Sequence, residues 1–174
     1  MVYDLVARPI PTVELPHGYV WIPWSPRLID AHACVKYNGF RDNFDSEIFP
    51  SFSSLEGCKR LMDVIASRQG FLPGTTWLIA KSTVDSKMEY CATIQGIQHS
   101  PEEGGIQNVA VIPNHRKLGL GKALVLQCLS GFQKAGVRKV ALEVTADNYT
   151  ALHLYTRIGF QTRETVYKAI LSNS

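Results

Sequence analysis

The stretch PNHRKLGLGKAL, residues 113–124, constrains the fold most strongly, because it joins a strand pattern to a helix pattern through two glycines. The apolar run before it stops at Pro113, since proline cannot continue a central strand. After Gly119 and Gly121 the sequence keeps a helical periodicity to about Ala135. Glycine lets the main chain approach a ligand closely, and a helix N-terminus offers unpaired N–H groups and the positive end of its dipole. With basic residues beside it, the stretch predicts an anion-binding turn.

The remaining segments predict a mixed α/β fold. Strand patterns cover residues 19–24, 75–82, 88–99, 104–112, 136–144 and 160–171, and helix patterns cover residues 26–40, 53–70, 119–135 and 148–159. Ser53 or Ser54 is the expected N-cap of the second helix, and Gly39 is the expected end of the first. The two strand patterns joined by the polar TVDSK predict an antiparallel pair. Residues 1–18, which hold three prolines, predict extended and irregular chain.

Length and composition fit one globular domain. A chain of 174 residues, 45% hydrophobic and 19% charged, can bury a single core. The net charge of +3 is mild, and no basic run with interleaved aromatic residues indicates a nucleic-acid surface. The sequence shows neither a signal-peptide pattern at its start nor an uninterrupted apolar run of about 18 residues. We therefore expect a soluble cytoplasmic protein with no nucleic-acid or membrane partner.

The four cysteines do not form a recognisable metal or disulfide pattern. Cys34, Cys58, Cys91 and Cys128 are widely separated, with no C-x-x-C pair and no histidine at metal-ligand spacing. We expect reduced, structural thiols and no metal site.

Two nucleotide-binding motifs compete for the glycine stretch. The Walker A pattern fails, because Lys122 is not followed by serine or threonine and the first glycine of the motif is missing. The dinucleotide fingerprint G-x-G-x-x-G is met at Gly119 and Gly121, but Leu124 occupies its third glycine position. Glu143 follows about twenty residues later at a strand end, where that fold needs an acidic residue. Dinucleotide binding therefore stays open as an alternative.

A second pattern lies downstream of the glycines. The strand end V-x-P and the turn [QR]-x-x-G-x-[GA] are matched by Val111, Pro113, Arg116, Gly119 and Gly121. The pattern N-x-x-A-x-x-L-Y-x-x-x-G-F is matched by Asn148, Ala151, Leu154, Tyr155, Gly159 and Phe160. Over residues 106–160 the chain thus resembles the GNAT superfamily of N-acetyltransferases, with local similarity to ribosomal-protein N-acetyltransferases. The resemblance implies a single domain over residues 1–174, with a mixed, mostly antiparallel central sheet flanked by helices.

The resemblance also implies a co-substrate. Members of the superfamily transfer acetyl from acetyl-coenzyme A to an amine. Coenzyme A carries a pyrophosphate, which suits the anion-binding turn, and a pantetheine arm whose amides can pair with a strand edge. The implied coenzyme-binding residues are Val109, Ala110, Val111, Arg116, Lys117, Leu118, Gly119, Leu120, Gly121, Lys122 and Asn148. His115, beside Arg116, is expected only to add polarity at the phosphate end.

By the same resemblance, two residues carry the acid–base chemistry. Tyr155 would protonate the departing thiolate as general acid. Glu143 matches the position of the base proposed in ribosomal-protein N-acetyltransferases, with water or Glu103 as substitutes. The acceptor is expected to be a primary amine of a small molecule or a protein, and a homodimer is left open. The alternative is a non-catalytic module that binds an acyl-coenzyme A or a dinucleotide.

Overall fold

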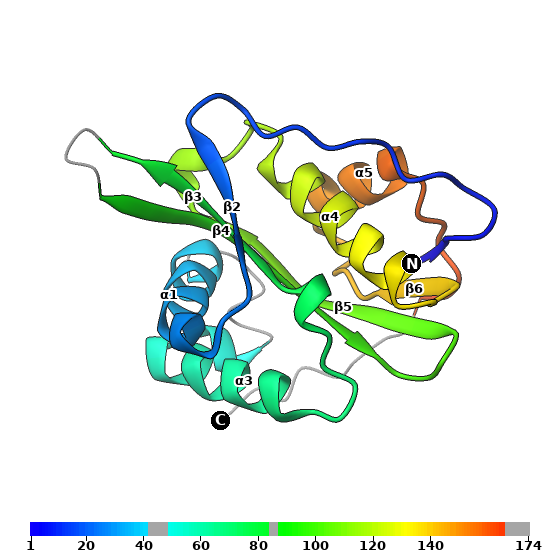
Figure 1. Cartoon of the computed structure of the whole chain (residues 1–174), viewed down its shortest axis with the longest axis horizontal. Helices are drawn as coiled ribbons and strands as arrows, with labels where there is room; N and C mark the ends of the chain where they lie inside the picture. The colour runs from blue at the N-terminus through cyan, green and yellow to red at the C-terminus, as the bar shows by residue number, and fades with distance from the viewer. Residues whose placement is uncertain (42–48, 84–86, 166–174) are drawn as a thin grey trace.

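The computed structural model describes residues 1–41, 49–83 and 87–165, and these form a six-stranded sheet with helices on both faces (Figure 1). The strands are β1 (Val2–Asp4), β2 (Tyr19–Pro23), β3 (Trp77–Ser82), β4 (Met88–Gln98), β5 (Glu103–Val111) and β6 (Lys139–Leu142). The α-helices are α1 (Ile29–Phe40), α3 (Leu55–Ser67), α4 (Leu120–Lys134) and α5 (Tyr149–Ile158). Short 3₁₀ turns occur at Pro26–Leu28, Pro50–Phe52, Pro73–Thr75 and Pro113–His115.

The sheet has the strand order β1-β6-β5-β4-β3-β2. Every neighbouring pair is antiparallel except β5 and β6, which run parallel. Helix α4 connects these two strands, as a parallel pair requires a crossover. The predicted fold class, a mixed and mostly antiparallel sheet flanked by helices, is confirmed.

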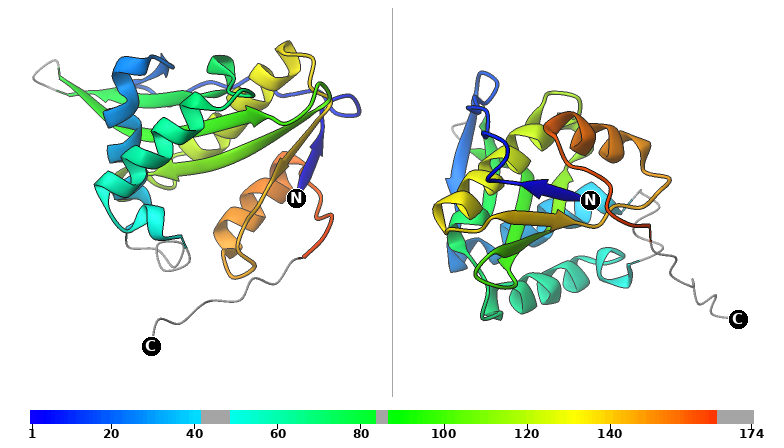
Figure 2. Two further views of the ribbon diagram at one scale, coloured as in Figure 1. Left: turned by 90° about the horizontal axis from the view of Figure 1, so that it is seen from below. Right: turned by 90° about the vertical axis from the view of Figure 1, so that its right-hand side faces the viewer.

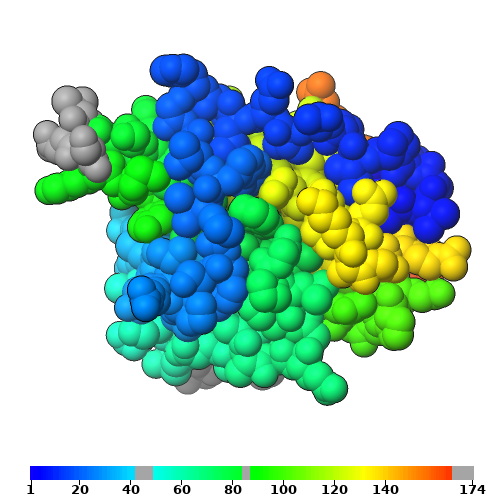
Figure 3. Space-filling view, in the orientation of Figure 1, coloured from blue at the N-terminus to red at the C-terminus, as the bar shows by residue number. Residues whose placement is uncertain are grey.

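The helices divide between the two faces of the sheet. Helices α1 and α3 pack together on one face, and α4 and α5 lie on the other (Figure 2, right). The larger core fills the space between α4 and the sheet and includes Leu124, Leu129 and Phe132, all fully buried. A smaller cluster of Ala33, Phe52, Cys58 and Met62 joins α1 to α3. The N-terminal segment before β2 crosses beside α4 on the molecular surface (Figure 3), where Ile10, Val13 and Leu15 pack against the larger core.

Local signals explain where the helices begin and end. The Ser54 hydroxyl accepts the Gly57 N–H at 3.0 Å, which confirms Ser54 as the N-cap of α3. Helix α5 ends at Gly159, whose φ of +117° closes the last turn in a left-handed conformation. Among the described residues no helix has the length and apolar content needed to cross a bilayer.

Two predictions for the first helix and the N-terminal residues are wrong. Residues 2–4, expected to be irregular, form β1, which pairs with β6 and buries Tyr3. Gly39 does not end α1, because Arg41 is the C-cap. A Cβ on Gly39 would lie only 2.9 Å from the Cβ of Ala110, so glycine allows α1 to approach β5 closely.

The last strand pattern of the sequence, residues 160–171, forms only one bridge within the described residues. Gln161 pairs with Val2 at the edge of β1, and residues 162–165 form no strand. Residues 166–171 lie outside the described part of the chain. The strand predicted over residues 136–144 is shorter than expected, since β6 ends at Leu142.

Candidate active site

Strands β5 and β6 pair over only part of their length, and this leaves an edge of β5 open inside the sheet. The parallel pairing runs from Glu103 opposite Lys139 to Ile106 opposite Leu142. Beyond that point β5 continues to Val111, whereas the chain after β6 turns away toward α5 (Figure 2, left). We call residues 107–111 of β5 the open edge.

The main chain of the open edge is oriented by its pairing with β4. The register skips Gln107, so this residue forms a bulge where β5 leaves β6. The Ile112 N–H donates to the Cys91 carbonyl at 2.9 Å. Because hydrogen-bonded and non-hydrogen-bonded positions alternate in an antiparallel ladder, the N–H groups of Val109 and Val111 point away from β4, toward the open side. A ligand with amide groups can therefore pair with them as an added strand would.

The turn after β5 leads into an uncapped helix N-terminus. Lys117 has φ +63° and Gly119 has φ +82°, so two left-handed residues curl the backbone just before α4. Gly119 is the N-cap and provides no side-chain acceptor, and no acidic residue occupies the first turn of α4. The N–H groups of Leu120, Gly121 and Lys122 precede the first helical bond, which Ala123 makes to Gly119 at 3.0 Å. These features suit a phosphate group.

Gly121 lies where three predicted segments meet. A Cβ at this position would be 3.5 Å from Cδ2 of Leu154 and 3.9 Å from Cγ2 of Val111. The end of the open edge, the start of α4 and the middle of α5 are therefore neighbours. The resemblance of the sequence motifs had predicted that these segments share one site, and in the structure they lie next to one another.

Arg116 braces the turn. Its Nε donates to the Val111 carbonyl at 3.1 Å and its Nη2 donates to the Gly39 carbonyl at 2.9 Å. The guanidinium thus ties the turn to the end of β5 and to the last turn of α1. Its predicted contact with phosphate stays a prediction, and the observed contacts give it a positioning role.

The predicted residues on and before α5 occupy three different environments. Asn148 is the N-cap of the helix, where its Oδ1 accepts the Ala151 N–H at 3.1 Å. Tyr155 is buried and packs against Phe160, with ring centroids 5.8 Å apart. Glu143 is exposed directly after β6. Their predicted contacts with a co-substrate stay predictions.

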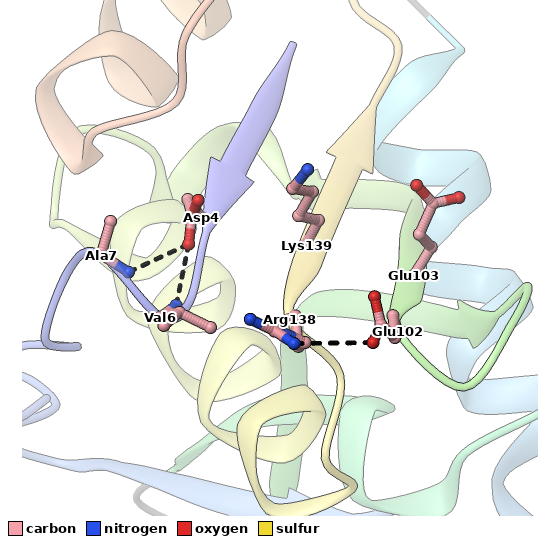
Figure 4. A pocket seen from close by; sticks show the side chains of 7 residues that line it. All are labelled: Asp4, Val6, Ala7, Glu102, Glu103, Arg138 and Lys139. Carbon is pink, nitrogen blue, oxygen red and sulfur yellow. Dashed lines mark hydrogen bonds and ion pairs between the residues drawn. The ribbon is translucent and has the colours of Figure 1, made fainter.

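A hollow at the opposite end of the sheet does not belong to this site (Figure 4). Its lining residues are Asp4, Val6, Ala7, Glu102, Glu103, Arg138 and Lys139. Asp4 accepts the N–H groups of Val6 and Ala7, both at 2.9 Å, which lowers the pKa of its carboxyl group. Glu103 starts β5 here, about 25 Å from Val111 for eight residues of extended strand. We therefore do not retain Glu103 as a substitute base.

Sequence reasoning missed a buried polar layer beneath the open edge. Lys36 of α1 is fully buried, and its Nζ donates to Oδ1 of Asn108 at 2.8 Å and to Sδ of Met62 at 3.0 Å. Burial lowers the pKa of Lys36 to about 7. One turn earlier, His32 Nδ1 lies 2.7 Å from the hydroxyl of Thr93, and burial followed by the charge of Lys36 lowers its pKa to about 3. The sequence feature that could have indicated this layer is the pair His32 and Lys36, two polar residues four positions apart on the face of α1 that also carries Ala33 and Gly39.

The interpretation of His115 is also corrected. The ring is 6% exposed, its Nδ1 lies 2.7 Å from the hydroxyl of Tyr19, and its Nε2 lies 3.3 Å from Oε2 of Glu89. It is a buried side chain whose two ring nitrogens contact Tyr19 of β2 and Glu89 of β4.

An open strand edge that ends at an uncapped, basic helix N-terminus suits a ligand that joins an amide-bearing chain to a pyrophosphate. With the strand order of this sheet, that arrangement defines the GNAT class of acyltransferase folds. The chain belongs to the acetyltransferase (GNAT) family, whose model matches residues 54–160. The dinucleotide alternative loses its support, since the β5–α4 turn continues a largely antiparallel sheet.

Three comparisons illustrate the relationship. The chain is 34% identical over 87 residues to a [ribosomal protein bS18]-alanine N-acetyltransferase of Escherichia coli K12, a match that covers 50% of this chain and 57% of the relative. A GCN5-related N-acetyltransferase structure from Sphaerobacter thermophilus has a TM-score of 0.65 at 24% identity and covers 91% of this chain and 45% of that one. AAC(6')-Iy in complex with the bisubstrate analogue CoA-S-monomethyl-acetylneamine has a TM-score of 0.63 at 11% identity, covering 87% of this chain and 96% of that one.

The matched chain spans little more than half the length of this curated relative. The family match also leaves out residues 1–53, and with them α1. The family match therefore includes the open edge and the uncapped helix N-terminus.

Proposed function

We propose that the protein is an N-acetyltransferase that transfers the acetyl group of acetyl-coenzyme A to a primary amine. The observation that carries this proposal is the open edge of β5 leading directly to the uncapped N-terminus of α4. The family uses acetyl-coenzyme A, and a structural neighbour is in complex with a coenzyme A analogue. When bound, acetyl-coenzyme A supplies an activated acyl group as a thioester.

The residues present fit this co-substrate. The N–H groups of Val109 and Val111 would pair with the amides of the pantetheine arm, and those of residues 120–122 would receive the pyrophosphate. Lys117 and Lys122 are exposed beside the turn and add positive charge. Arg116 would hold the turn in place through its two carbonyl contacts.

Tyr155 and Glu143 are the proposed acid and base. An alkylamine is mostly protonated near neutral pH, so an acceptor must lose a proton before it attacks. Glu143, an exposed carboxylate beyond β6, would accept that proton directly or through water. Tyr155 follows Leu154, whose side chain neighbours Gly121, and the Tyr155 hydroxyl would donate a proton to the leaving sulfur.

Binding and turnover are tested together. Calorimetry should show binding of coenzyme A and no binding of NAD, and a thiol-release assay across an amine library should identify acceptors. Gly121→Glu places a carboxylate where the helix N–H groups should meet phosphate, so its coenzyme A affinity should fall at least about ten-fold, or about 1.4 kcal/mol. Gly121→Ala is the matched control, because its Cβ makes only ordinary contacts of 3.5 Å and longer. NAD binding without coenzyme A binding would overturn the proposal.

The roles of the acid and base need separate variants. Tyr155→Phe keeps the ring against Phe160, so coenzyme A affinity should persist while kcat falls at least about ten-fold. Glu143→Gln should lower the rate more near neutral pH than near about pH 10, where much of the amine has already lost its proton, and so shift the pH profile. Unchanged kcat in Tyr155→Phe would mean that Tyr155 only packs against Phe160 and is not the acid. If Glu143→Gln leaves both the rate and its pH profile unchanged, water must serve as the base.

The acceptor class is a small-molecule or protein amine. The second candidate, a coenzyme-binding module without turnover, shares the same binding geometry. It would give coenzyme A binding without thiol release for any amine. The cytoplasmic location, the single domain and a homodimer remain predictions.

A further inference from the structure

Three side chains of different ligand types converge between β4 and the turn after β5. Their donor atoms, a carboxylate oxygen of Glu89, Sγ of Cys91 and a ring nitrogen of His115, all lie within 4.8 Å of one another. Cys91 is fully buried and His115 is 6% exposed, whereas the Glu89 side chain is 44% exposed. The cluster therefore has a buried interior and one opening to solvent, at Glu89.

The geometry is close to that of a tetrahedral metal site. Ligand bonds of about 2.0–2.3 Å place neighbouring donor atoms of a zinc site about 3.3–3.6 Å apart. Nε2 of His115 lies 3.3 Å from Oε2 of Glu89, so this pair already has the required separation. The register between β3 and β4 skips Cys91, so this residue forms a bulge, and its Sγ lies on the same side as the Glu89 carboxylate, within 4.8 Å. Cys91 Sγ donates to the main-chain carbonyl of Glu89 at 3.0 Å, and loss of the thiol proton would free this side chain to turn toward the other two donors.

The hydrogen bond behind His115 supports this role. A metal-bound imidazole usually donates its other N–H to an oxygen, which fixes the ring. Here the hydroxyl of Tyr19 lies 2.7 Å from Nδ1 and can either donate or accept. The ring can therefore shift its proton from Nε2 to Nδ1, expose the Nε2 lone pair and keep its bond to Tyr19.

We propose that Glu89, Cys91 and His115 bind a zinc(II) ion, with a fourth position open to water. A neutral imidazole, a thiolate and a carboxylate carry a net charge of −2, which balances the ion. Thiolate and imidazole donors favour zinc over magnesium or calcium. Binding releases the Cys91 proton to solvent, and no electron transfer is required. A cation lies beside the Tyr19 ring, since Nζ of Lys81 is 5.6 Å from the centre of that ring, whose hydroxyl contacts His115.

The site would anchor the coenzyme-binding turn. His115 immediately precedes Arg116, so a metal at His115 would hold the start of this turn against β4. The open edge of β5 leads directly into this turn, so the metal would also hold the end of the open edge in place.

Cobalt(II) titration of the purified full chain tests the site directly. Cobalt bound to a thiolate gives a charge-transfer band in the near ultraviolet, and tetrahedral geometry gives strong visible bands. We expect one cobalt per chain, displaced by zinc. Cys91→Ser should abolish the charge-transfer band, and His115→Gln should weaken binding at least about ten-fold. Cys34→Ser is the matched control, because Cys34 is an exposed cysteine outside the cluster.

Two results would overturn the proposal. One is the absence of a thiolate band at saturating cobalt in the folded wild-type chain. The other is a band that survives in Cys91→Ser and disappears in Cys34→Ser. Should Cys91→Ser fail to fold by circular dichroism, Glu89→Gln replaces it, since that side chain is half exposed and its loss should weaken cobalt binding at least about ten-fold. Unchanged affinity in Glu89→Gln would then reject the site.

Discussion

The fully buried Lys36 makes the free energy of unfolding depend on pH, and Lys36→Met removes that dependence. Burial lowers the pKa of this lysine from 10.5 to about 7, and the Cys58 charge opposes that shift. A tenfold change in a proton-binding constant is worth about 1.4 kcal/mol, so the fall costs the folded state up to about 5 kcal/mol below pH 7. Methionine matches the unbranched stem and can pack against Met62.

The sign follows from the protons bound in each state. Between the folded pKa of about 7 and the unfolded value of 10.5, the unfolded chain keeps the lysine proton and the folded chain has released it. The free energy of unfolding therefore rises with pH in this window. From about pH 6.5 to about pH 8.5 the contribution of Lys36 amounts to about 2 kcal/mol.

Lys36→Met should accordingly be more stable than the wild type near pH 6.5. The gain is the removed cost of burial, about 5 kcal/mol, less about 1 kcal/mol for the Asn108 oxygen that loses its donor, which leaves about 4 kcal/mol. The difference between the variants should shrink by about 2 kcal/mol at about pH 8.5. Urea denaturation at a series of pH values, followed by circular dichroism, measures both quantities.

The comparison cancels the titrating groups that do not interact with Lys36. Cys58 and His32 are exceptions, because burial raises the pKa of Cys58 and lowers that of His32, and the charge of Lys36 lowers both; their own titrations lie outside the window from about pH 6.5 to about pH 8.5. Lys59→Met is the matched control, since Lys59 is exposed and paired with Asp30 at 2.7 Å, and its curve should stay parallel to the wild type. Parallel curves for Lys36→Met and the wild type would refute the reasoning, because they would mean that Lys36 keeps its proton in the folded protein.

Three further changes test the fold around the site. Gly39→Ala should lower the free energy of unfolding by about 1–3 kcal/mol, because its Cβ would lie 2.9 Å from that of Ala110. Gly74→Ala is the control, since a Cβ there would meet no atom within 4 Å and should leave the stability unchanged. Equal losses of stability in the two variants, measured by urea denaturation, would contradict the close packing of Gly39. Ser54→Ala should cost about 1 kcal/mol through loss of the α3 cap, measured by thermal denaturation, and an unchanged Tm would argue against the cap. Arg116→Ala should lower coenzyme A affinity with little change in its salt dependence, because the side chain braces carbonyls; a clear loss of salt dependence in calorimetry would instead indicate a direct phosphate contact.

The sequence predicted those parts of the fold that local chemistry determines. The periodicity of residues 119–135 predicted α4 with nearly correct ends, and one of the two serines expected to cap α3, Ser54, is its N-cap. Strand β1 was missed because three residues carry too little periodicity, and its pairing with β6 depends on partners 135–139 residues away in the chain. Gly39 was misinterpreted because glycine is favoured both at a helix end and where a helix lies close to a strand. Only the position of Ala110 in the folded protein shows that the second reason applies here.

The candidate site divides in the same way. The motif residues of the turn are consecutive in the chain, so resemblance could place them without knowledge of the fold. Lys36 and Asn108, or Cys91 and His115, meet only after the sheet forms, and no spacing rule relates their positions. Polar residues within otherwise apolar segments were the available signal, and their partners could not be named.

The open edge of β5 also sets how quickly individual amide hydrogens exchange with solvent deuterium. Neighbouring amides on this one strand should alternate, with those of Ala110 and Ile112 protected by β4 and those of Val109 and Val111 exchanging rapidly in the free protein. A ligand that adds as a strand would slow only the second set. The strand therefore contains its own internal reference, and deuterium uptake at single-residue resolution can follow occupancy of the site without any label or acceptor.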